Sequence, residues 1–478
     1  MLRRTKIIAT LGPSSCDHEV LEGMVHAGMN VARINFSHGQ SEDYPKLITI
    51  LREISATNNC EIGIIADLQG PKIRIRSFSS GKVLLKSADE FFLDTLLGEF
   101  DGNTTGVGVD YENLHHDINI NDKLLLDDGK LILRVERIEM TRIYTKVIVG
   151  GELSNHKGVN FPAGGISVPV ITKKDRQDIK LAAELRVDFL AVSFVRCAKD
   201  VCETRLLFED AGGSGKIISK IERAEAYENL DELIEVSDAL MVARGDLGIE
   251  MGFSELTGIQ KEIIRKTRRK NKVVITATEM MQSMIHSQSP TRAEVADVSN
   301  AVMDGTDAVM LSAETAIGDD PIKVVSTMSE VCRGAEKYIL RKGRNAYRID
   351  DAFQSIDESI AMAAMYTANH FSIKAIIAMT ESGSTPLWMS RIRSDIPIYA
   401  LTNHKESRRR VTLYRGVYPV LFPLKDETVT LSDEIIFDLM IKNNYVNQGD
   451  LVILTKGSKD GLSGGTNSMR ILKVISSK

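Results

Sequence analysis

Two short stretches of the sequence carry charged side chains whose types and spacing suit work on a phosphate with a divalent metal ion. In SKIER (219–223), Lys220 and Glu222 stand two residues apart, so an extended chain points both side chains to the same face. In MVARGDLG (241–248), Asp246 lies in a glycine-flanked turn, where the backbone can approach a ligand closely. Two carboxylates from neighbouring strands form the sparse oxygen site that Mg2+ prefers, because this ion keeps several of its waters. The alternatives are an exposed ion pair and an ordinary turn.

A second set of side chains suits phosphate recognition. NFSHG (35–39) follows an apolar segment that contains Arg33, and an arginine beside Asn, Ser and His offers several hydrogen-bond donors to a phosphate. SNHKGVN (154–160) places Lys157 beside a glycine, and this lysine could reach a phosphate from another side. The alternative for NFSHG is turn chemistry, because Asn, Ser and Gly are common turn residues.

Polar residues collect at the ends of several apolar, strand-like segments. A charged residue that ends a strand is usually a solvated cap, so each residue alone has a simple structural explanation. The recurrence of such ends instead predicts that the side chains share one site at one edge of a sheet. The residues are Arg33, Asn35, Ser37, His38, Asp67, Lys220, Glu222, Arg244, Asp246, Thr278, Glu279, Ser312 and Glu314.

Eight short apolar segments, most of them separated by helical patterns, recur along the first two thirds of the chain. Near-continuous apolar strands that alternate with helices are typical of a parallel (β/α)8 barrel, the TIM barrel of the α/β class. An open doubly wound sheet is an alternative that periodicity does not exclude. In a barrel, functional groups gather at the C-terminal ends of the strands, where these polar residues stand. The segments are 6–12, 30–36, 61–67, 187–194, 216–222, 238–246, 272–279 and 307–315.

The alternation is interrupted between the third and fourth segments. Residues 71–168 contain short alternating runs with Gly and Asp turns, which are typical of a small antiparallel β-domain. We expect an insertion in a βα loop that forms a lid over the barrel, which then comprises residues 1–70 and 169–345.

A third pattern covers residues 346–478, where a helix capped at Ser355 is followed by five strand-like runs. This pattern predicts a separate C-terminal α/β domain.

The composition limits the class of protein. The 478 residues are 43% hydrophobic, which supports a packed core, and the net charge of −5 lacks the basic excess of a large nucleic-acid footprint. The five cysteines show no CxxC spacing, so neither a disulfide framework nor a zinc site is expected. The apolar run near the N-terminus is too short for a signal peptide, and no stretch approaches the length of a membrane span. We therefore expect a soluble cytoplasmic protein without a nucleic-acid or membrane partner.

The motifs and their order resemble those of the pyruvate kinase family from about residue 3 to the C-terminus. The resemblance rests on NFSHG, GPKIR, NHKGVN, SKIER, ARGDLG, ITATEMMQSM with PTRAEVADVSNAV, and DGTDAVMLSAETAIG. It implies phosphoryl transfer from phosphoenolpyruvate to ADP, which gives pyruvate and ATP in the final step of glycolysis. It also implies a barrel catalytic domain, a β-domain lid, a C-terminal domain regulated by a phosphorylated effector such as a sugar phosphate or AMP, and a homotetramer.

The resemblance assigns roles to a metal site and a nucleotide site. It implies that Glu222 and Asp246 hold Mg2+ or Mn2+. It also implies that Lys220 stabilises the transferred phosphoryl group and the developing enolate, where a fixed positive charge is most valuable. The residues implied to contact the nucleotide phosphates are Asn35, Ser37, His38, Arg74 and Lys157.

The same resemblance implies a binding site for phosphoenolpyruvate and a source for the proton that the enolate takes up. Thr278, and Ser312 with Glu314 through water, are the candidates for delivering that proton to carbon. The groups implied to position phosphoenolpyruvate are Arg33, the backbone of Gly245 and Asp246, and the hydroxyl of Thr278.

The loop after Asp67 departs from the common pattern of the family. Many members bind K+ through Asn, Ser, Asp and Thr oxygens, with a glutamate in a Gly-Pro-Glu loop. This sequence keeps Asn35, Ser37 and Asp67, but has Leu68 in place of the threonine and Lys72 in place of the glutamate. Losing an oxygen ligand weakens a K+ site, whereas an ammonium carries the charge of the ion itself. The sequence thus resembles the bacterial K+-independent branch, with Lys72 as the substitute for K+; the alternative is an exposed hinge lysine and a retained K+ requirement.

The C-terminal region contains MTESGSTP (379–386), where a strand-like run leads into a helical pattern. Such a loop can hold a phosphate at a helix N-terminus, although ordinary helix capping also explains it. The family binds phosphorylated effectors in this region, and GGTNSMR (464–470) could complete the pocket. Arginine often occurs where Ser384 stands, so the identity of the effector stays open. The implied effector residues are Thr380, Glu381, Ser382, Gly383, Ser384 and Thr385.

Other functions would use part of the same residues. A Mg2+-dependent lyase or aldolase acting on pyruvate enolates would need Glu222 and Asp246 but neither the lid lysine nor the nucleotide contacts. A catalytically silent nucleotide-binding scaffold would lack a catalytic group, yet Lys220 and Thr278 are also present. A phosphohistidine-type phosphotransferase would need a nucleophilic histidine, and no histidine has a convincing context. The enolate lyase is therefore the main alternative to the kinase.

Overall fold

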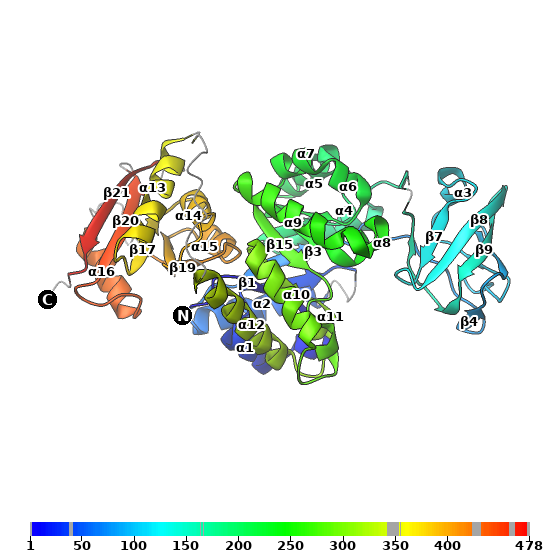
Figure 1. Cartoon of the computed structure of the whole chain (residues 1–478), viewed down its shortest axis with the longest axis horizontal. Coiled ribbons are helices and arrows are strands. Elements are labelled where there is room, and N and C mark those ends of the chain that lie inside the picture. The colour runs from blue at the N-terminus through cyan, green and yellow to red at the C-terminus, as the bar shows by residue number, and fades with distance from the viewer. Residues whose placement is uncertain are drawn as a thin grey trace.

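The computed structural model describes residues 2–37, 42–162, 164–165, 167–341, 353, 355–422, 432–457 and 464–475. Figure 1 shows three parts along the long axis of the molecule, with a barrel surrounded by helices between two outer parts that each contain a sheet. The inserted strands (cyan) lie at one end, and the C-terminal strands and helices (yellow to red) lie at the other.

Eight parallel strands form the central barrel: β1 (Lys6–Leu11), β2 (Val31–Asn35), β3 (Gly63–Asp67), β12 (Phe189–Val192), β13 (Lys216–Ile221), β14 (Ala239–Ala243), β15 (Val273–Ala277) and β16 (Ala308–Leu311). They close in the order β1-β16-β15-β14-β13-β12-β3-β2, because β1 pairs with β2 on one side and with β16 on the other. The predicted TIM barrel is therefore confirmed, and the open doubly wound sheet is excluded. Every residue of β1, β3, β14 and β15 is buried, as expected for strands with side chains inside the barrel and helices outside it.

Helices surround the barrel and carry the apolar side chains that cover its outer face. Leu51 and Ile263, for example, are fully buried in the same apolar cluster as the outward-facing strand residues Ile64 and Val274. The helices are α1 (His18–Ala27), α2 (Tyr44–Thr57), α4 (Lys173–Glu184), α5 (Ala198–Asp210), α6 (Ala224–Glu228), α7 (Leu230–Val236), α8 (Arg244–Met251), α9 (Phe253–Arg269), α10 (Arg292–Asp304), α11 (Ala313–Ala316) and α12 (Pro321–Arg341), with the 3-10 turns η1 (Pro13–Ser15) and η2 (Gln282–Ile285).

The inserted strands form a separate layer between β3 and α4, in which the described strand pairs are antiparallel except for β5 with β6. Its six-stranded sheet has the order β11-β7-β8-β9-β5-β6, and a two-stranded sheet pairs β10 with β4. The layer has its own apolar core, which includes Phe91, Leu124 and Ile143. The elements are β4 (Lys82–Leu85), β5 (Glu90–Asp94), β6 (Gly106–Gly108), α3 (Leu114–Asp117), β7 (Lys123–Leu126), β8 (Leu131–Glu139), β9 (Arg142–Val149), β10 (Gly151–Ser154) and β11 (Val159–Asn160).

One carboxylate ties together the points where the chain leaves the barrel and returns to it. Thr172 and Asp175 form the predicted capping pair of α4, in which Thr172 Oγ1 accepts from Asp175 N at 3.1 Å and Asp175 Oδ2 accepts from Thr172 N at 2.9 Å. The other oxygen of Asp175 accepts a hydrogen bond from Gly70 N at 3.1 Å. Gly70 ends the exit loop of β3, so the two connections of the inserted layer are held side by side.

The C-terminal part contains a five-stranded sheet in the order β19-β18-β17-β20-β21, in which only the β20–β21 pair is antiparallel among the described residues. Ser355 caps its first helix by accepting a hydrogen bond from Glu358 N at 3.3 Å. The elements are α13 (Ile356–His370), β17 (Ala375–Met379), α14 (Ser384–Ser390), β18 (Ile398–Thr402), α15 (Lys405–Val411), β19 (Val417–Leu421), α16 (Asp433–Lys442), β20 (Leu451–Gly457) and β21 (Thr466–Lys473).

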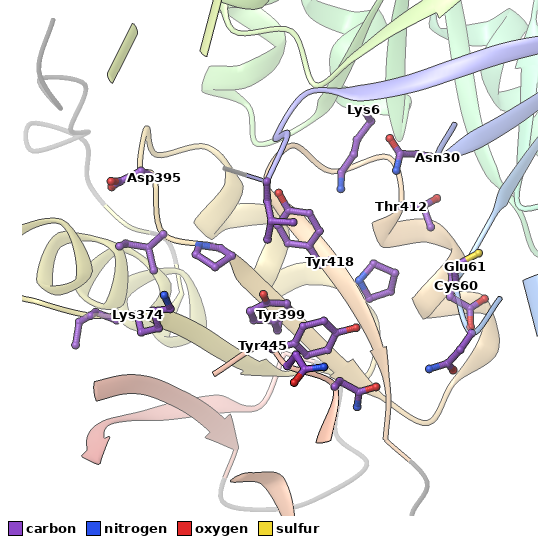
Figure 2. A pocket seen from close by; sticks show the side chains of 18 residues that line it. Lys6, Asn30, Cys60, Glu61, Lys374, Asp395, Tyr399, Thr412, Tyr418 and Tyr445 are labelled. Carbon is purple, nitrogen blue, oxygen red and sulfur yellow. The ribbon is translucent and has the colours of Figure 1, made fainter. Parts of the chain in front are cut away.

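The barrel and the C-terminal sheet share a packed junction. Ile8 and Ile65 of the barrel belong to the same apolar cluster as Ile376 and Ile398 of the C-terminal sheet. Beside this core is a cavity of about 730 Å³, drawn in Figure 2. Lys6 enters it from β1, where its ammonium donates to the carbonyl of Val417 and lies 4.5 Å from the ring centroid of Tyr418. The N-terminal ends of the strands therefore face the C-terminal sheet, which leaves their C-terminal ends on the side of the inserted layer.

Candidate active site

A buried cluster of charged side chains lies where β2, β3 and β13 end. Lys220 Nζ lies 2.9 Å from Glu222 Oε1 and 3.3 Å from Asp67 Oδ1, and it donates to Ser193 Oγ at 2.7 Å. The barrel makes this contact possible, because β12 pairs with both β3 and β13 and so holds their ends close together. One ammonium group thus faces two buried carboxylates at the end of the barrel where catalytic groups are expected.

Arg33 of β2 extends this cluster on the other side of Asp67. Its Nε lies 2.6 Å from Asp67 Oδ2, and its Nη1 donates to Thr10 Oγ1 at 2.9 Å. These contacts fix the plane of the guanidinium. Within the described part of the chain Nη2 has no hydrogen-bond partner, so it is the donor group of Arg33 that can serve a ligand.

The charges in the cluster set the pKa of each group. Burial alone would lower the pKa of Lys220, but the carboxylates of Asp67 and Glu222 outweigh burial and raise it. Burial would raise the pKa of Asp67, but Lys220 and Arg33 outweigh burial and lower it. Burial does raise the pKa of Glu222, against the attraction of Lys220 and with a further contribution from Asp246. The charged form of Lys220 is therefore favoured, whereas burial and the nearby Asp246 disfavour the charged form of Glu222.

This pair of carboxylates fits a divalent ion that takes few protein ligands. No group of three or more His, Cys, Asp or Glu side chains suited to a metal occurs in the described ranges. A site with two carboxylates suits Mg2+ or Mn2+, which complete their coordination with water and substrate oxygens, and does not suit a closed zinc site. Burial and, to a lesser extent, Asp246 raise the pKa of Glu222, and a cation beside the two carboxylates would favour the charged form.

The other wall of the site is the first turn of α8, directly after β14. Gly245 N donates to Thr278 Oγ1 at 2.9 Å, and Arg244 Nη2 donates to the carbonyl of Thr278 at 2.7 Å. Thr278 and Glu279 have φ values of +66° and +53°, a left-handed conformation that is uncommon for residues with a β-carbon. Strained backbone of this kind clusters at functional sites, and here it is held by contacts with α8.

A cleft of about 270 Å³ separates this wall from the inserted layer. Lys72, which follows the exit loop of β3, crosses it, and its Nζ lies 3.6 Å from Asp246 Oδ1. Among the described residues the ion pair of Lys72 is with Asp246 and not with Asp67. The cleft is lined by Lys72, Asp128, Gly245, Asp246, Ile249, Phe253, Thr278, Glu279, Gln282, Ser312, Ala313 and Glu314.

Ser312 and Glu314 follow β16 and reach the same cleft. Glu314 is buried, and its two oxygens accept hydrogen bonds from Ser312 N at 2.6 Å and from Met281 N at 3.1 Å. The carboxylate therefore joins the loops after β15 and β16. This arrangement makes Glu314 a group that positions the backbone around Ser312 and Thr278.

Two of the predicted nucleotide residues lie on the inserted layer, near the cleft but outside its lining. Arg74 Nη1 donates to the carbonyl of His156 at 3.0 Å, and Lys157 Nζ lies 2.8 Å from Asp127 Oδ1. Asp127 precedes Asp128, which does line the cleft. Both cations are thus held at the edge of the inserted layer that borders the cleft.

The loop after β2 holds the remaining predicted phosphate ligands. Asn35 Oδ1 accepts a hydrogen bond from Ser37 N at 3.1 Å, which is the local turn geometry expected of an Asn at a strand end. Lys174 Nζ donates to the carbonyl of Phe36 at 2.6 Å and so anchors this turn to α4. His38 lies outside the described residues.

The predicted effector loop lies between β17 and α14, at the junction of the barrel and the C-terminal part. Gly383 adopts φ +88° before α14, and its N donates to Thr380 Oγ1 at 2.9 Å. Ser382 and Ser384 line a cavity of about 720 Å³ together with Gly464. The remaining residues of the loop are also held: the Glu381 carboxylate pairs with His404, and Thr385 and Thr466 share a hydrogen bond of 2.8 Å.

Three contributors to the site were not identified in the sequence. Ser193 accepts the hydrogen bond of Lys220, and Phe194 N donates to Glu222 Oε2 at 2.7 Å with Phe194 at φ +56°. Thr10 at the end of β1 accepts from Arg33. Ser193 and Thr10 stand at strand ends like the residues that were chosen, so the same criterion could have found them. The role of Phe194 comes from its backbone, which leaves no side-chain signal.

Comparison with known proteins decides which reaction this geometry serves. The chain matches the family model "Pyruvate kinase, barrel domain" over residues 2–325 and the model "Pyruvate kinase, alpha/beta domain" over residues 358–472. It is 51% identical over 477 residues to a pyruvate kinase of Buchnera aphidicola from Schizaphis graminum, covering 99% of both chains. It is 49% identical, with the same coverage, to pyruvate kinase II of Salmonella typhimurium, and 46% identical to a pyruvate kinase of Haemophilus influenzae.

The chain belongs to the pyruvate kinase family. The predicted activity is thereby confirmed as that of a phosphotransferase that moves the phosphoryl group of phosphoenolpyruvate to ADP, giving pyruvate and ATP in glycolysis. Members of the pyruvate kinase family generally require a divalent metal ion. None of these matches supports the enolate-lyase alternative. Among the described helices, none is long and apolar enough to cross a membrane.

Proposed function

We propose that the buried cluster and the adjoining cleft carry out this transfer, with Lys220 as the central catalytic residue. The observation that carries the proposal is the position of the Lys220 ammonium, which is fixed by Asp67, Glu222 and Ser193 beside the first turn of α8. A positive charge fixed in advance stabilises charge that develops during the reaction without reorganising solvent. Lys220 would face the phosphoryl group in transfer and then the enolate oxygen that remains.

Phosphoenolpyruvate would bind between this cluster and α8. The free Nη2 of Arg33 would bind its phosphate, because the other guanidinium contacts are taken by Asp67 and Thr10. The first turn of α8 would offer the backbone N–H of Asp246 to the carboxylate of the substrate, and that of Gly245 once it leaves Thr278 Oγ1, because helix N-termini favour negative charge. The hydroxyl of Thr278 completes the site by a contact with the same turn.

Glu222 and Asp246 would hold Mg2+ or Mn2+. The bound ion supplies charge neutralisation for the phosphate and carboxylate oxygens of the substrate. The protein contributes the two carboxylates and the N–H of Phe194, which orients Glu222 from behind.

The inserted layer would act as a lid that brings ADP to the cleft. Arg74 and Lys157 stand on its edge and would contact the nucleotide phosphates together with Asn35, Ser37 and His38. Along the chain, the layer connects to the barrel through Gly70 at one end and through α4 at the other. Its separate apolar core lets it move as a unit. Closure would exclude water, which protects the transferred group from hydrolysis.

The proton that converts the enolate to pyruvate would come from the wall formed by Thr278 and Ser312. Both residues line the cleft, whereas both oxygens of Glu314 accept hydrogen bonds from the backbone. Thr278 is the stronger candidate, because its hydroxyl touches Gly245 N beside the substrate site. Ser312 would pass a proton through water, with Glu314 holding its backbone in place.

Lys72 would make the reaction independent of K+. Its ammonium crosses the cleft and lies 3.6 Å from Asp246 Oδ1, so it supplies a monovalent positive charge beside the metal site. Leu68, which replaces a threonine oxygen ligand, is buried and offers no ligand to a cation. The region that would hold K+ in other members comprises Asn35, Ser37, Asp67 and Lys72.

The metal assignment is tested by binding of Mn2+, followed by electron paramagnetic resonance on the purified protein with and without phosphoenolpyruvate. Glu222→Gln and Asp246→Asn should each weaken Mn2+ binding at least tenfold, as expected for loss of one charged ligand of two. Glu255→Gln, an exposed residue in the first turn of α9, serves as the control and should bind as the parent does. Unchanged Mn2+ affinity in both variants would overturn the assignment.

We also propose that residues 346–478 act as a regulatory domain, with residues 1–70 and 169–345 as the catalytic barrel and 71–168 as the lid. A phosphorylated effector, a sugar phosphate or AMP, would bind at Thr380–Thr385, because Ser382, Ser384 and Gly464 line one cavity there. Calorimetric titration with sugar phosphates and AMP tests this site. Binding that survives Ser384→Asp, which adds a negative charge to the loop, would contradict it.

The family resemblance and the composition support a proposal for the assembly and the location of the protein. We expect a homotetramer in the cytoplasm. Light scattering coupled to size-exclusion chromatography would measure the mass of the assembly, and a dimer or monomer mass would refute the expectation.

A further inference from the structure

Four arginines surround a small cavity where the barrel meets the C-terminal part, away from the cleft described above. We call Arg4, Arg268, Arg393 and Arg415 the interdomain arginine cluster. Arg4 precedes β1 and Arg268 lies in α9, while Arg393 follows α14 and Arg415 precedes β19. All four line a cavity of about 30 Å³. Each side of the junction thus contributes two guanidinium groups to one small cavity, at which Arg393 is exposed.

The carboxylate of this cavity offsets only part of the positive charge of the cluster. Glu336 lines the cavity, but its oxygens accept hydrogen bonds from the backbone N–H groups of Arg4, at 3.0 Å and 3.1 Å, and of Thr5, at 2.6 Å. Nearby Asp307 is engaged in a buried ion pair with Arg391. Across the described ranges, no member of the cluster forms an ion pair with a carboxylate.

Arg268, Arg393 and Arg415 instead contact neutral carbonyl groups, most of them across the junction. Arg268 donates to the carbonyls of Gly305 and Arg391 at 2.8 Å and 2.7 Å. Arg415 donates to two barrel carbonyls at 3.0 Å and 3.2 Å, and Arg393 donates to another at 3.2 Å. These contacts satisfy N–H groups, but they supply no negative charge.

Arg4 is the least satisfied member of the cluster. The residue is 7% exposed, and its guanidinium has no hydrogen-bond partner among the residues that the structure describes. Burial lowers the pKa of Arg4, and Arg415 adds to this by repulsion. Burial, followed by repulsion from Arg391, lowers the pKa of Arg268 to about 9. Glu336, Asp395 and Asp307 oppose these shifts but do not cancel them. Buried charges that are only partly compensated are costly, so the site as built favours an anion.

We propose that the interdomain arginine cluster binds one small inorganic anion of the size of chloride, which links the barrel to the C-terminal part. A negative ion would accept hydrogen bonds from Arg4 and screen the repulsion among the four guanidinium groups. The volume restricts the ligand, because about 30 Å³ exceeds the roughly 10–15 Å³ needed for one water but is far below the several hundred needed for a metabolite. Since the charges come from both sides, the bound ion would strengthen the junction.

Bromide is the probe, because it replaces chloride and gives an anomalous X-ray signal. Crystals of the full chain soaked in sodium bromide should show an anomalous peak among Arg4, Arg268, Arg393 and Arg415. In solution, replacing acetate with bromide at equal ionic strength should change the Tm of the parent more favourably than that of a variant that lacks the cluster, because the general effect of the two salts is common to both proteins. No peak in the cluster, or the same bromide-minus-acetate difference in Tm in the parent and in such a variant, would overturn the proposal.

Two variants connect the effect to the cluster. Arg393→Gln removes a member from the solvent side, and Arg4→Gln removes a buried one. Each should lower the bromide-minus-acetate difference in Tm below that of the parent. Arg393→Gln keeps the test valid if Arg4→Gln fails to fold. Arg134→Gln, an exposed arginine in β8, is the control and should keep the parent's difference. Loss of the difference in Arg134→Gln, or its survival in Arg393→Gln, would contradict the proposal.

Discussion

Replacing Lys220 with methionine tests the part of the site on which the proposed chemistry depends. The substitution keeps a long, flexible side chain but removes the ammonium that lies 2.9 Å from Glu222 and 3.3 Å from Asp67. Asp67 keeps its second partner, because Arg33 Nε remains 2.6 Å from Oδ2. Glu222 keeps only the hydrogen bond from Phe194 N.

Two effects of different size should follow. Removing one fixed donor aimed at developing charge typically lowers kcat by about 100- to 1,000-fold. Removing one partner from a buried ion pair costs roughly 3–5 kcal/mol of stability when the other charge is left alone. The cost here should lie at the lower end of that range, since Arg33 still compensates Asp67. The variant should therefore fold, with a lower Tm and almost no turnover.

Steady-state production of pyruvate and equilibrium binding of phosphoenolpyruvate should be measured on the same preparation. We expect kcat to fall at least about 100-fold while binding of phosphoenolpyruvate stays measurable, because Arg33 and the first turn of α8 are intact. Lys266→Met, which removes an exposed ion pair with Asp231, is the control and should keep the parent's kcat. A kcat for Lys220→Met within tenfold of the parent would refute the role given to Lys220.

Three further substitutions separate other parts of the account. Thr278→Val keeps the β-branched shape at φ +66° but removes the hydroxyl, so kcat should fall by about 100-fold with little change in Tm; an unchanged kcat would transfer the proton role to Ser312. Lys72→Glu should make activity depend on K+, whereas the exposed control Lys86→Glu should not; activity of Lys72→Glu that ignores K+ would speak against the substitute cation. Burial lowers the pKa of Lys6 from 10.5 to about 7. Between these two pH values the unfolded chain binds more protons than the folded chain. The free energy of unfolding should therefore rise with pH in this range, by at most ~1.4 kcal/mol per pH unit. Denaturant titrations of Lys6→Met should lack this rise, and a parallel pH profile would contradict the assignment.

The regular part of the fold could be predicted because its signal is local. Each barrel strand is a short apolar run in the sequence, and the first and last residues of each run lie within a few residues of the ends of the observed strand. Periodicity left the closed barrel and the open doubly wound sheet as alternatives, because closure depends on the pairing of β1 with β16, which are separated by most of the catalytic region. Periodicity describes each strand and says nothing about which strand lies beside it.

The site shows the same division between local and long-range information. Lys220 and Glu222 were expected on one face of a strand, and they do face the same point. The contact of Lys220 with Asp67, by contrast, requires β3 and β13 to flank β12. Lys72 is a second example. Its positive charge suggested a substitute for a cation, but its partner, Asp246, is distant in the sequence and could not be inferred from the local pattern.

The most direct test of the account is a rate measurement on the unmodified protein. Pyruvate formation from phosphoenolpyruvate and ADP should be followed with Mg2+ in a buffer of Na+ or Tris that contains no K+, and then after K+ is added. We expect full activity without K+ and no increase on its addition, because the ammonium of Lys72 already supplies the charge beside Asp246. Activity that requires K+ would contradict this role of Lys72.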